Sequence, residues 1–265
     1  MTQFNSEQYW ESRLKKETGS KGVGFIGLGT HYNNWLYKIQ EHLFRRHVAG
    51  LTADWSQKNV LDIGSGTGFY LEQWKKLGVR SITASDMTDA ALENIAKKFP
   101  GIESHKFSAG KAIPETLCRN RYDAISAIAV LFHIVDDAEY RMAFNNISRL
   151  LRPDGFFIFT ENFLHRKTYR QAHFVGRPLR EIEGILEENG LKVLLRKPMF
   201  VLSNYPTDTP DSLPLRKYWE IMMLPVRKSE LYGLIFGGIM YAAELFLTSI
   251  IDESPSAEIM VCVKI

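Results

Sequence analysis

Four residues near position 65 have the types and the spacing to hold a charged small molecule. Asp62, Gly64, Gly66 and Gly68 alternate with other residues directly after the apolar pair Val60-Leu61. Glycine turns the backbone sharply and leaves no Cβ between the main chain and a ligand. The carboxylate of Asp62 would repel a pyrophosphate but suits a cationic group. The pattern therefore favours a positively charged ligand.

The elements that must position these residues are those of a nucleotide-binding α/β sheet. A short strand over 60–63 runs into the glycines, and the following residues predict a helix that Gly78 ends. A dinucleotide site has the spacing G-x-G-x-x-G, and here Phe69 occupies the position of its third glycine. Two alternatives stay open: a nicotinamide-dependent oxidoreductase on a similar sheet, and a non-catalytic or membrane-associated interaction protein of this fold.

The Asp62-x-Gly64-x-Gly66-x-Gly68 pattern resembles motif I of the class I S-adenosylmethionine (SAM) dependent methyltransferases. Residues 150–156 similarly resemble the approach to the fifth strand of that family. The resemblance implies a Rossmann-like α/β fold: a seven-stranded mixed sheet with helices on both faces and an antiparallel last strand between strands five and six. It also implies SAM as the cofactor and methyl transfer to a small molecule as the activity.

The end of the predicted second strand supplies a second carboxylate. Asp86 closes the β-favouring run 81–86, where doubly wound nucleotide folds place the acid that binds ribose hydroxyls. The resembled family often has an acid after strand three to contact adenine, and this chain has none there, so we expect backbone amides to serve instead. The predicted cofactor-binding residues are Asp62, Gly64, Gly66, Gly68, Asp86, Met87, Ala109, Gly110 and Ile128.

Two side chains are candidates for removing a proton from the acceptor. His133 follows the predicted strand four over 122–131, and the imidazole pKa suits general base catalysis near neutral pH. Glu161, at the end of strand five, is the second candidate. With Asn162 and the Asp136-Asp137 pair it could instead bind Mg²⁺ through oxygen ligands. Because the pair is better explained as a helix cap, we predict no metal.

Bulk composition narrows the class of protein further. The chain has 265 residues, 45% of them apolar, and a formal net charge of +3. These values favour one large globular domain, and the charge is too small and scattered to predict nucleic-acid binding. Cys118 and Cys262 have no metal-ligand spacing, and the first residues have no apolar run of a secretory signal. We therefore expect a cytoplasmic protein.

The segments outside the predicted sheet suggest where the acceptor binds. About 55 residues separate the sixth and last strands, too many for an ordinary loop, and two apolar helical segments are expected near 216–226 and 230–251. We expect a lid over an apolar small-molecule acceptor, favour O-methylation, and name His31, Tyr32 and Met222 as substrate-binding candidates. The predicted divisions are a helical cap over 1–58, a SAM-binding core over 59–200, a helical lid over 201–256 and the final strand over 257–265.

One stretch has the length and composition of a membrane span. Residues 231–251 are almost all apolar, with Gly233 and Gly237 at G-x-x-x-G spacing. Glu244 lies inside this stretch, and a carboxylate within a bilayer is costly. We therefore favour a buried or lid helix over contact with a membrane.

Overall fold

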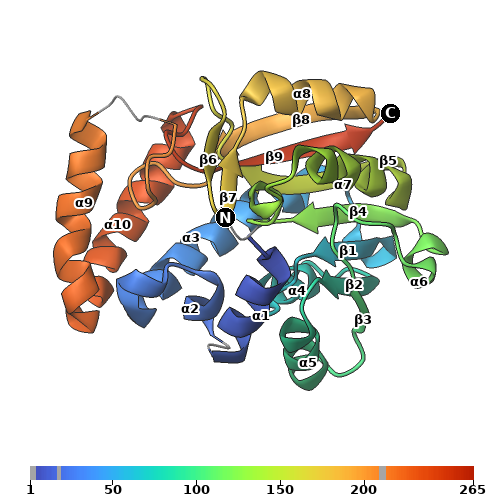
Figure 1. Ribbon diagram of the computed structural model, residues 1–265, viewed down its shortest axis with the longest axis horizontal. Helices are drawn as coiled ribbons and strands as arrows, with labels where there is room; N and C mark the ends of the chain where they lie inside the picture. The colour runs from blue at the N-terminus through green and yellow to red at the C-terminus, as the bar shows by residue number, and fades with distance from the viewer. Residues whose placement is uncertain (1–3, 17–18, 209–212) are drawn as a thin grey trace.

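The computed structural model describes residues 4–16, 19–208 and 213–265, and its centre is a seven-stranded mixed sheet (Figure 1). β9 pairs antiparallel with both of its neighbours, and the other pairs in this sheet are parallel. The predicted fold is confirmed, including the place of the last strand. From one edge to the other the order is β3 (Glu103–Lys106), β2 (Ser81–Asp86), β1 (Asn59–Ile63), β4 (Tyr122–Ala127), β5 (Leu151–Glu161), β9 (Glu258–Lys264) and β8 (Leu191–Pro198).

Helices bury both faces of this sheet. Successive strand residues point to opposite faces, so Leu61 and Ile125 belong to one core cluster while Val60 and Ala124 belong to the other. Burial on both faces explains the nearly continuous apolar runs of the central strands. The covering helices are α7 (Asp137–Leu150) and α8 (Leu179–Glu188) on the first face, and α3 (Gly29–Val48) and α4 (Phe69–Lys76) on the second, with α5 (Asp89–Lys98) packed beside β2 and β3.

The start of the described chain packs against the carboxyl ends of β1 and β2. Helices α1 (Ser6–Lys16) and α2 (Ser20–Val23) precede α3, and α1 contacts α5. The Glu11 carboxylate accepts a hydrogen bond from the Ala90 backbone N–H at 3.2 Å. The short helices of the connections are η1 (Ile26–Leu28), η2 (Ala49–Leu51), η3 (Trp55–Gln57) and α6 (Glu115–Cys118).

The strand predicted over 122–131 is shorter in the structure. β4 ends at Ala127, Ala129 has a φ of 58°, and residues Leu131–His133 form the 3₁₀ helix η4. The apolar run continues beyond the strand because the segment that leaves the sheet is itself packed on the core. This bend brings His133 to the rim of the sheet.

A small hairpin beside this bend was absent from the predicted elements. β6 (Tyr169–Gln171) and β7 (Phe174–Gly176) pair antiparallel, and β7 contacts η4. Between 169 and 175 the β-favouring residues are only Tyr169, Phe174 and Val175, so the sequence gives little signal for this hairpin.

The insertion before β9 forms an outer helical layer. α9 (Leu213–Lys228) and α10 (Glu230–Ile250) contact each other, and α10 runs along α3 at the left of Figure 1. Gly237 permits the close approach, since a Cβ there would lie 2.4 Å from Cδ1 of Trp35. The Trp35 indole N–H also donates to the Leu234 carbonyl at 2.8 Å.

The carboxylate inside the apolar helix points into the protein. Glu244 is fully buried, and its two oxygens accept backbone N–H groups from Val201, Leu202 and Ser203 at 2.5–2.7 Å. By length and composition, α10 is the one helix among the described residues that could cross a membrane. The three bonds to Glu244 instead join this helix to the loop after β8.

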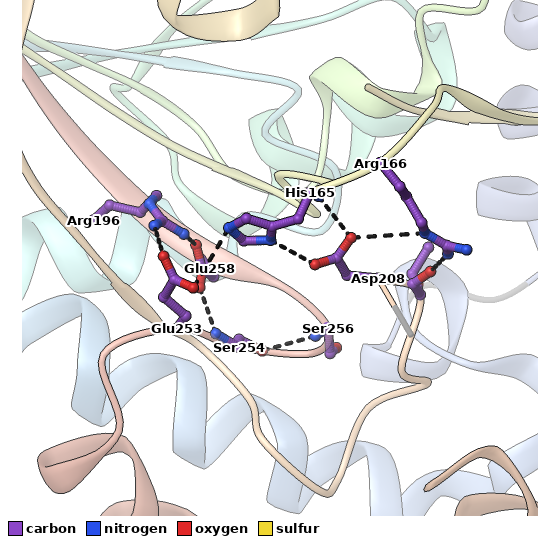
Figure 2. A network of polar contacts seen from close by, with 9 residues as sticks. His165, Arg166, Arg196, Asp208, Glu253, Ser254, Ser256 and Glu258 are labelled. Atoms are coloured by element: carbon purple, nitrogen blue, oxygen red, sulfur yellow. Dashed lines mark hydrogen bonds and ion pairs between the residues drawn. The ribbon is translucent and has the colours of Figure 1, made fainter. Parts of the chain in front are cut away.

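A polar network fixes both ends of the insertion (Figure 2). His165 lies between Asp208 and Glu253, with Nδ1 2.7 Å from Asp208 Oδ2 and Nε2 3.5 Å from Glu253 Oε2. Arg196 on β8 binds both Glu253 and Glu258. The hydrogen bond from His165 to Asp208 raises the pKa of the imidazole, which favours the charged form that bridges the two carboxylates.

Candidate functional site

The turn after β1 requires its three glycines. Gly64, Gly66 and Gly68 have φ angles of 70°, 51° and 80°, which side-chain-bearing residues rarely adopt. The Gly64 N–H donates to the Ser85 carbonyl at 2.8 Å, and the Gly68 N–H donates to the Ser65 carbonyl at 2.8 Å. The turn is therefore fixed against the end of β2.

Asp86 joins this turn to the start of the next helix. Its Oδ2 accepts from the Gly66 N–H at 2.9 Å, and its Oδ1 accepts from Thr88 N and Oγ1 at 2.9 and 2.8 Å. Burial raises the pKa of the carboxyl, and these hydrogen bonds oppose that rise. A carboxylate accepts about four hydrogen bonds, so one acceptor position remains for a ligand hydroxyl.

A narrow cavity of about 120 Å³ lies over the glycine turn and Asp86. Three of the residues that line it come from the N-terminal helical segment, namely Trp10, Leu14 and Val23. Their apolar side chains give no sequence signal of a ligand site. Of the predicted cofactor residues, those that line the cavity are Gly64, Gly66, Asp86, Met87, Ala109 and Ile128.

A second cavity of about 890 Å³ adjoins the first. The residues shared by both linings are Trp10, Val23, Tyr37, Gln40, Ala129 and His133. The larger cavity is strongly aromatic, and side chains from the hairpin, the segment after β8 and α9 complete it. Its further aromatic residues are Phe25, Phe132, Tyr169, Phe174, Phe200, Tyr205 and Trp219.

His133 lies where the two cavities meet. Its Nδ1 is 2.7 Å from the backbone carbonyl of His173, between β6 and β7. A carbonyl only accepts, so Nδ1 carries the hydrogen and Nε2 is left as the acceptor. Burial lowers the pKa of the imidazole to about 4, so the ring is neutral at physiological pH. The Trp10 ring packs edge-on against it, with 4.9 Å between ring centroids.

Comparisons with known proteins agree on the nature of this domain. Residues 60–155 match the family described as "Methyltransferase domain". An mRNA cap guanine-N(7) methyltransferase of Cryptococcus neoformans is 26% identical over 149 residues, covering 51% of this chain. The match spans only 23% of the length of that fungal protein.

Two solved structures share the fold. A SAM-dependent methyltransferase of Leishmania major superposes with a TM-score of 0.57 at 20% identity, covering 72% of this chain and 74% of its own. The N-methyltransferase NodS of Bradyrhizobium japonicum, in complex with S-adenosylhomocysteine, gives a TM-score of 0.51 at 18% identity, covering 72% and 89%.

The chain contains a class I SAM-dependent methyltransferase domain. Its cofactor is SAM, and the residues of the narrow cavity fit it. The backbone of Gly64 and Gly66 lines this cavity, and Asp86 keeps one acceptor position. A Cβ on Gly64 would lie 2.4 Å from Cγ2 of Val130, so packing also requires this glycine.

Three predicted cofactor residues lie behind the cavity wall of the methyltransferase domain. Asp62 is buried and its Oδ1 accepts from Ser126 Oγ at 2.5 Å. Burial raises the pKa of Asp62 to about 7. A Cβ on Gly68 would lie 2.2 Å from the Phe99 ring, and one on Gly110 would lie 2.7 Å from the Glu139 carbonyl oxygen. These two glycines are required by packing.

The three predicted substrate residues line neither cavity. The Tyr32 hydroxyl donates to the Ser203 carbonyl at 2.9 Å, so this ring joins α3 to the insertion. His31 is exposed, and Met222 packs on the core. The helix faces that carry these residues turn away from the larger cavity. α9 contributes Trp219, Glu220, Ile221, Leu224 and Arg227 to that cavity instead.

Glu161 does not reach either cavity. It is fully buried and accepts a hydrogen bond from the Tyr140 hydroxyl at 3.1 Å. Burial raises the pKa of its carboxyl to about 8. Its neighbours Thr160 and Asn162 line the larger cavity, because alternate strand residues point to opposite faces. The structure therefore leaves His133 as the candidate base.

The acids after β4 are engaged within the protein. Asp136 accepts from the Glu139 N–H at 2.9 Å and caps α7. Asp137 forms ion pairs with Arg177, at 2.8 Å, and with Arg170. In the part of the chain that the structure describes, no three His, Cys, Asp or Glu residues form a group that could hold a metal ion.

Proposed function

We propose that this protein transfers the methyl group of SAM to a hydroxyl oxygen of an apolar small molecule, with His133 as the general base. The observation that carries the proposal is the position and tautomer of His133. Its ring lies on the wall shared by both cavities, and the bond to His173 leaves Nε2 as its acceptor atom.

The narrow cavity would hold the donor. We assign the ribose hydroxyls to the remaining acceptor position of Asp86, and the amino-acid part to the backbone of Gly64 and Gly66. Met87, Ala109 and Ile128 would surround the adenine end. Asp62 would support the donor site indirectly, because its carboxylate accepts a hydrogen bond from Ser126 that fixes β1 against β4 behind the turn.

The bound cofactor would supply a methyl group on a sulfonium, an electrophile that reacts by in-line displacement. As the acceptor oxygen bonds to that carbon, the hydroxyl becomes strongly acidic. The neutral Nε2 of His133 then takes the proton, even though the imidazole has a pKa of only about 4. Trp10 and Phe132 surround the imidazole and keep water from it. The chain's main contributions are alignment and exclusion of water.

The larger cavity favours an acceptor with an aromatic or extended apolar body. Its volume of about 890 Å³ is ample for a drug-sized molecule. Aromatic rings dominate its walls, while Asn162, Gln171 and Arg227 offer a few polar contacts. A phenol or an alcohol on an apolar skeleton matches this lining.

Turnover of labelled SAM with a panel of apolar phenols and alcohols tests this proposal. We expect a methyl ether product, and His133→Gln should lower kcat by about 100-fold or more while leaving SAM affinity within a factor of about two. Because the pKa of His133 is about 4, kcat of the wild type should show no acidic limb near pH 6.5. Glu161→Gln is the matched control, since that side chain lies outside both cavities.

Other outcomes would redirect the proposal. Methylation of capped RNA or of a protein, the acceptors named for the fungal relative and for an EEF1A lysine methyltransferase of Danio rerio, would contradict a small-molecule acceptor. Binding of SAM without any transfer would favour the non-catalytic alternative. Binding of NAD alone would favour an oxidoreductase, although the antiparallel β9 differs from the parallel dinucleotide-binding sheet.

A further inference from the structure

One face of α10 is apolar and uncovered along the whole helix. Leu231, Ile235, Ile239, Phe246 and Ile250 follow one another at intervals of four or seven residues, which places them on one side. Ile235 is 58% exposed, and Ile239 and Phe246 are each 64% exposed. Contiguous apolar surface of this kind marks an interaction site.

The other side of α10 fixes the helix to the domain. Glu244 lies opposite the exposed face and accepts three backbone N–H groups from the loop after β8. Gly233 and Gly237 pack on Tyr32 and Trp35. A transmembrane orientation would break these contacts and expose the carboxylate to lipid. The geometry instead suits a helix that lies flat in a membrane interface.

Unpaired cations border the apolar face. Lys228 ends α9, two residues before the start of α10, and Lys38 lies over the Trp35 ring at 4.0 Å, beside the middle of α10. Neither forms an ion pair with a carboxylate in the described chain. The acids near the ends of α10 are engaged, Glu230 by the backbone N–H groups of Thr30 and His31, and Asp252 by Lys197.

This charge pattern decides between two occupants of the face. In a symmetric dimer of this chain the same patch would meet itself, and two α10 helices that cross near their middles would bring Lys38 close to the partner's Lys38. An anionic lipid surface would instead attract both lysines, and each lysine near that surface would strengthen the binding. Partly exposed Tyr232 at the start of α10 is also a side chain typical of lipid interfaces.

We propose that the exposed face of α10 docks on a bilayer containing anionic phospholipid, with the helix axis parallel to the membrane. The preceding helix α9 presents Ile221 and Leu224, both exposed, on the wall of the larger cavity. An apolar acceptor dissolved in the bilayer would then find that cavity close to the membrane surface. This last step alone rests on the proposed function, whereas the docking itself does not.

Sedimentation of the full chain with vesicles tests the docking. We expect binding to vesicles of phosphatidylcholine mixed with phosphatidylglycerol, weaker binding in high salt, and little binding to phosphatidylcholine alone. Ile235→Glu combined with Ile239→Glu should abolish binding. Lys38→Glu combined with Lys228→Glu should weaken it about tenfold or more.

Met142→Glu is the matched control, because Met142 is 47% exposed on α7, away from the insertion. It should bind vesicles like the wild type. SAM affinity and thermal unfolding, measured on every variant, show that each remains folded, and the positions changed on α10 are all exposed. These readouts also separate a failure of docking from a failure of methyl transfer.

Either of two results would overturn the proposal. One is that the wild type does not bind anionic vesicles, or that the variant with Ile235→Glu and Ile239→Glu still binds them. The other is a wild-type dimer in analytical ultracentrifugation that the same variant converts to monomer, since the face would then belong to a second copy.

Discussion

Asp86 shows how one side chain can fix a turn and still offer an acceptor position to a ligand. Its carboxylate accepts three protein hydrogen bonds, from Gly66 and from Thr88, and has one position left. These bonds fix the glycine turn before any ligand binds. Preorganisation of this kind reduces the entropy lost on binding.

Replacing Asp86 by alanine should weaken SAM binding about 10-fold to 100-fold, because a hydrogen bond to a charged group and the support of Gly66 are lost together. Isothermal titration with SAM measures the effect. Asp89→Ala is the control, since Asp89 is an exposed carboxylate that binds Lys106 at 2.9 Å. An unchanged dissociation constant for Asp86→Ala would remove this residue from the donor site.

Glu161 should make stability depend on pH. Burial raises its pKa from 4.5 to about 8, so between these values the folded state binds a proton that the unfolded state has released. The stabilisation is complete below pH 4.5 and is lost as the pH rises through about 8.

Glu161→Gln removes this titration. We expect the melting temperature of the wild type to fall relative to that of the variant, by about 10 °C, as the pH rises across this window. Differential scanning fluorimetry of both proteins over the same pH series measures it. Parallel curves would show that Glu161 does not titrate in this range.

At the scale of elements, one buried acid joins α10 to the loop after β8. Glu244 satisfies three backbone donors of the loop after β8, and the loss of its charge would leave them with weaker acceptors. We expect Glu244→Gln to lower the free energy of unfolding by about 2–3 kcal/mol. Urea denaturation measures the change, with Glu183→Gln on the exposed side of α8 as control. A loss no larger than that of the control would mean that the loop is held by other contacts.

The N-terminal helices cover the narrow cavity over the glycine turn, which we propose as the donor site. Trp10 packs against His133, and Val23 lies over Gly66, where a Cβ would be 3.1 Å from its Cγ1. Trp10→Ala should speed the dissociation of bound SAM about tenfold. Rapid dilution of the labelled complex measures the rate, and Ser12→Ala, exposed on α1, is the comparison. Equal rates in the two variants would exclude the cover.

Local sequence patterns predicted the elements better than their contacts. The turn after β1, the placement of Asp86 and the capped start of α7 follow from short-range spacing, and the structure has all three. The early end of β4 and the β6–β7 hairpin escaped prediction, because packing between segments distant in sequence decides them.

For the whole molecule, the comparisons confirm the class of domain, the sheet and the cofactor. The lining of the larger cavity was the part that sequence reasoning missed. His31, Tyr32 and Met222 were expected there, but which side of α3 and α9 faces the cavity depends on how the insertion packs. The predicted division into cap, core and lid stays a prediction.

The wall that both cavities share has a kinetic consequence. Trp10 and Val23 line both the narrow cavity and the larger cavity. If the two cavities hold donor and acceptor as we propose, an acceptor seated against these residues would fix the N-terminal helices in place, so that SAM would bind first and S-adenosylhomocysteine would leave last. Steady-state turnover should therefore follow a compulsory order, with S-adenosylhomocysteine competing against SAM and not against the acceptor.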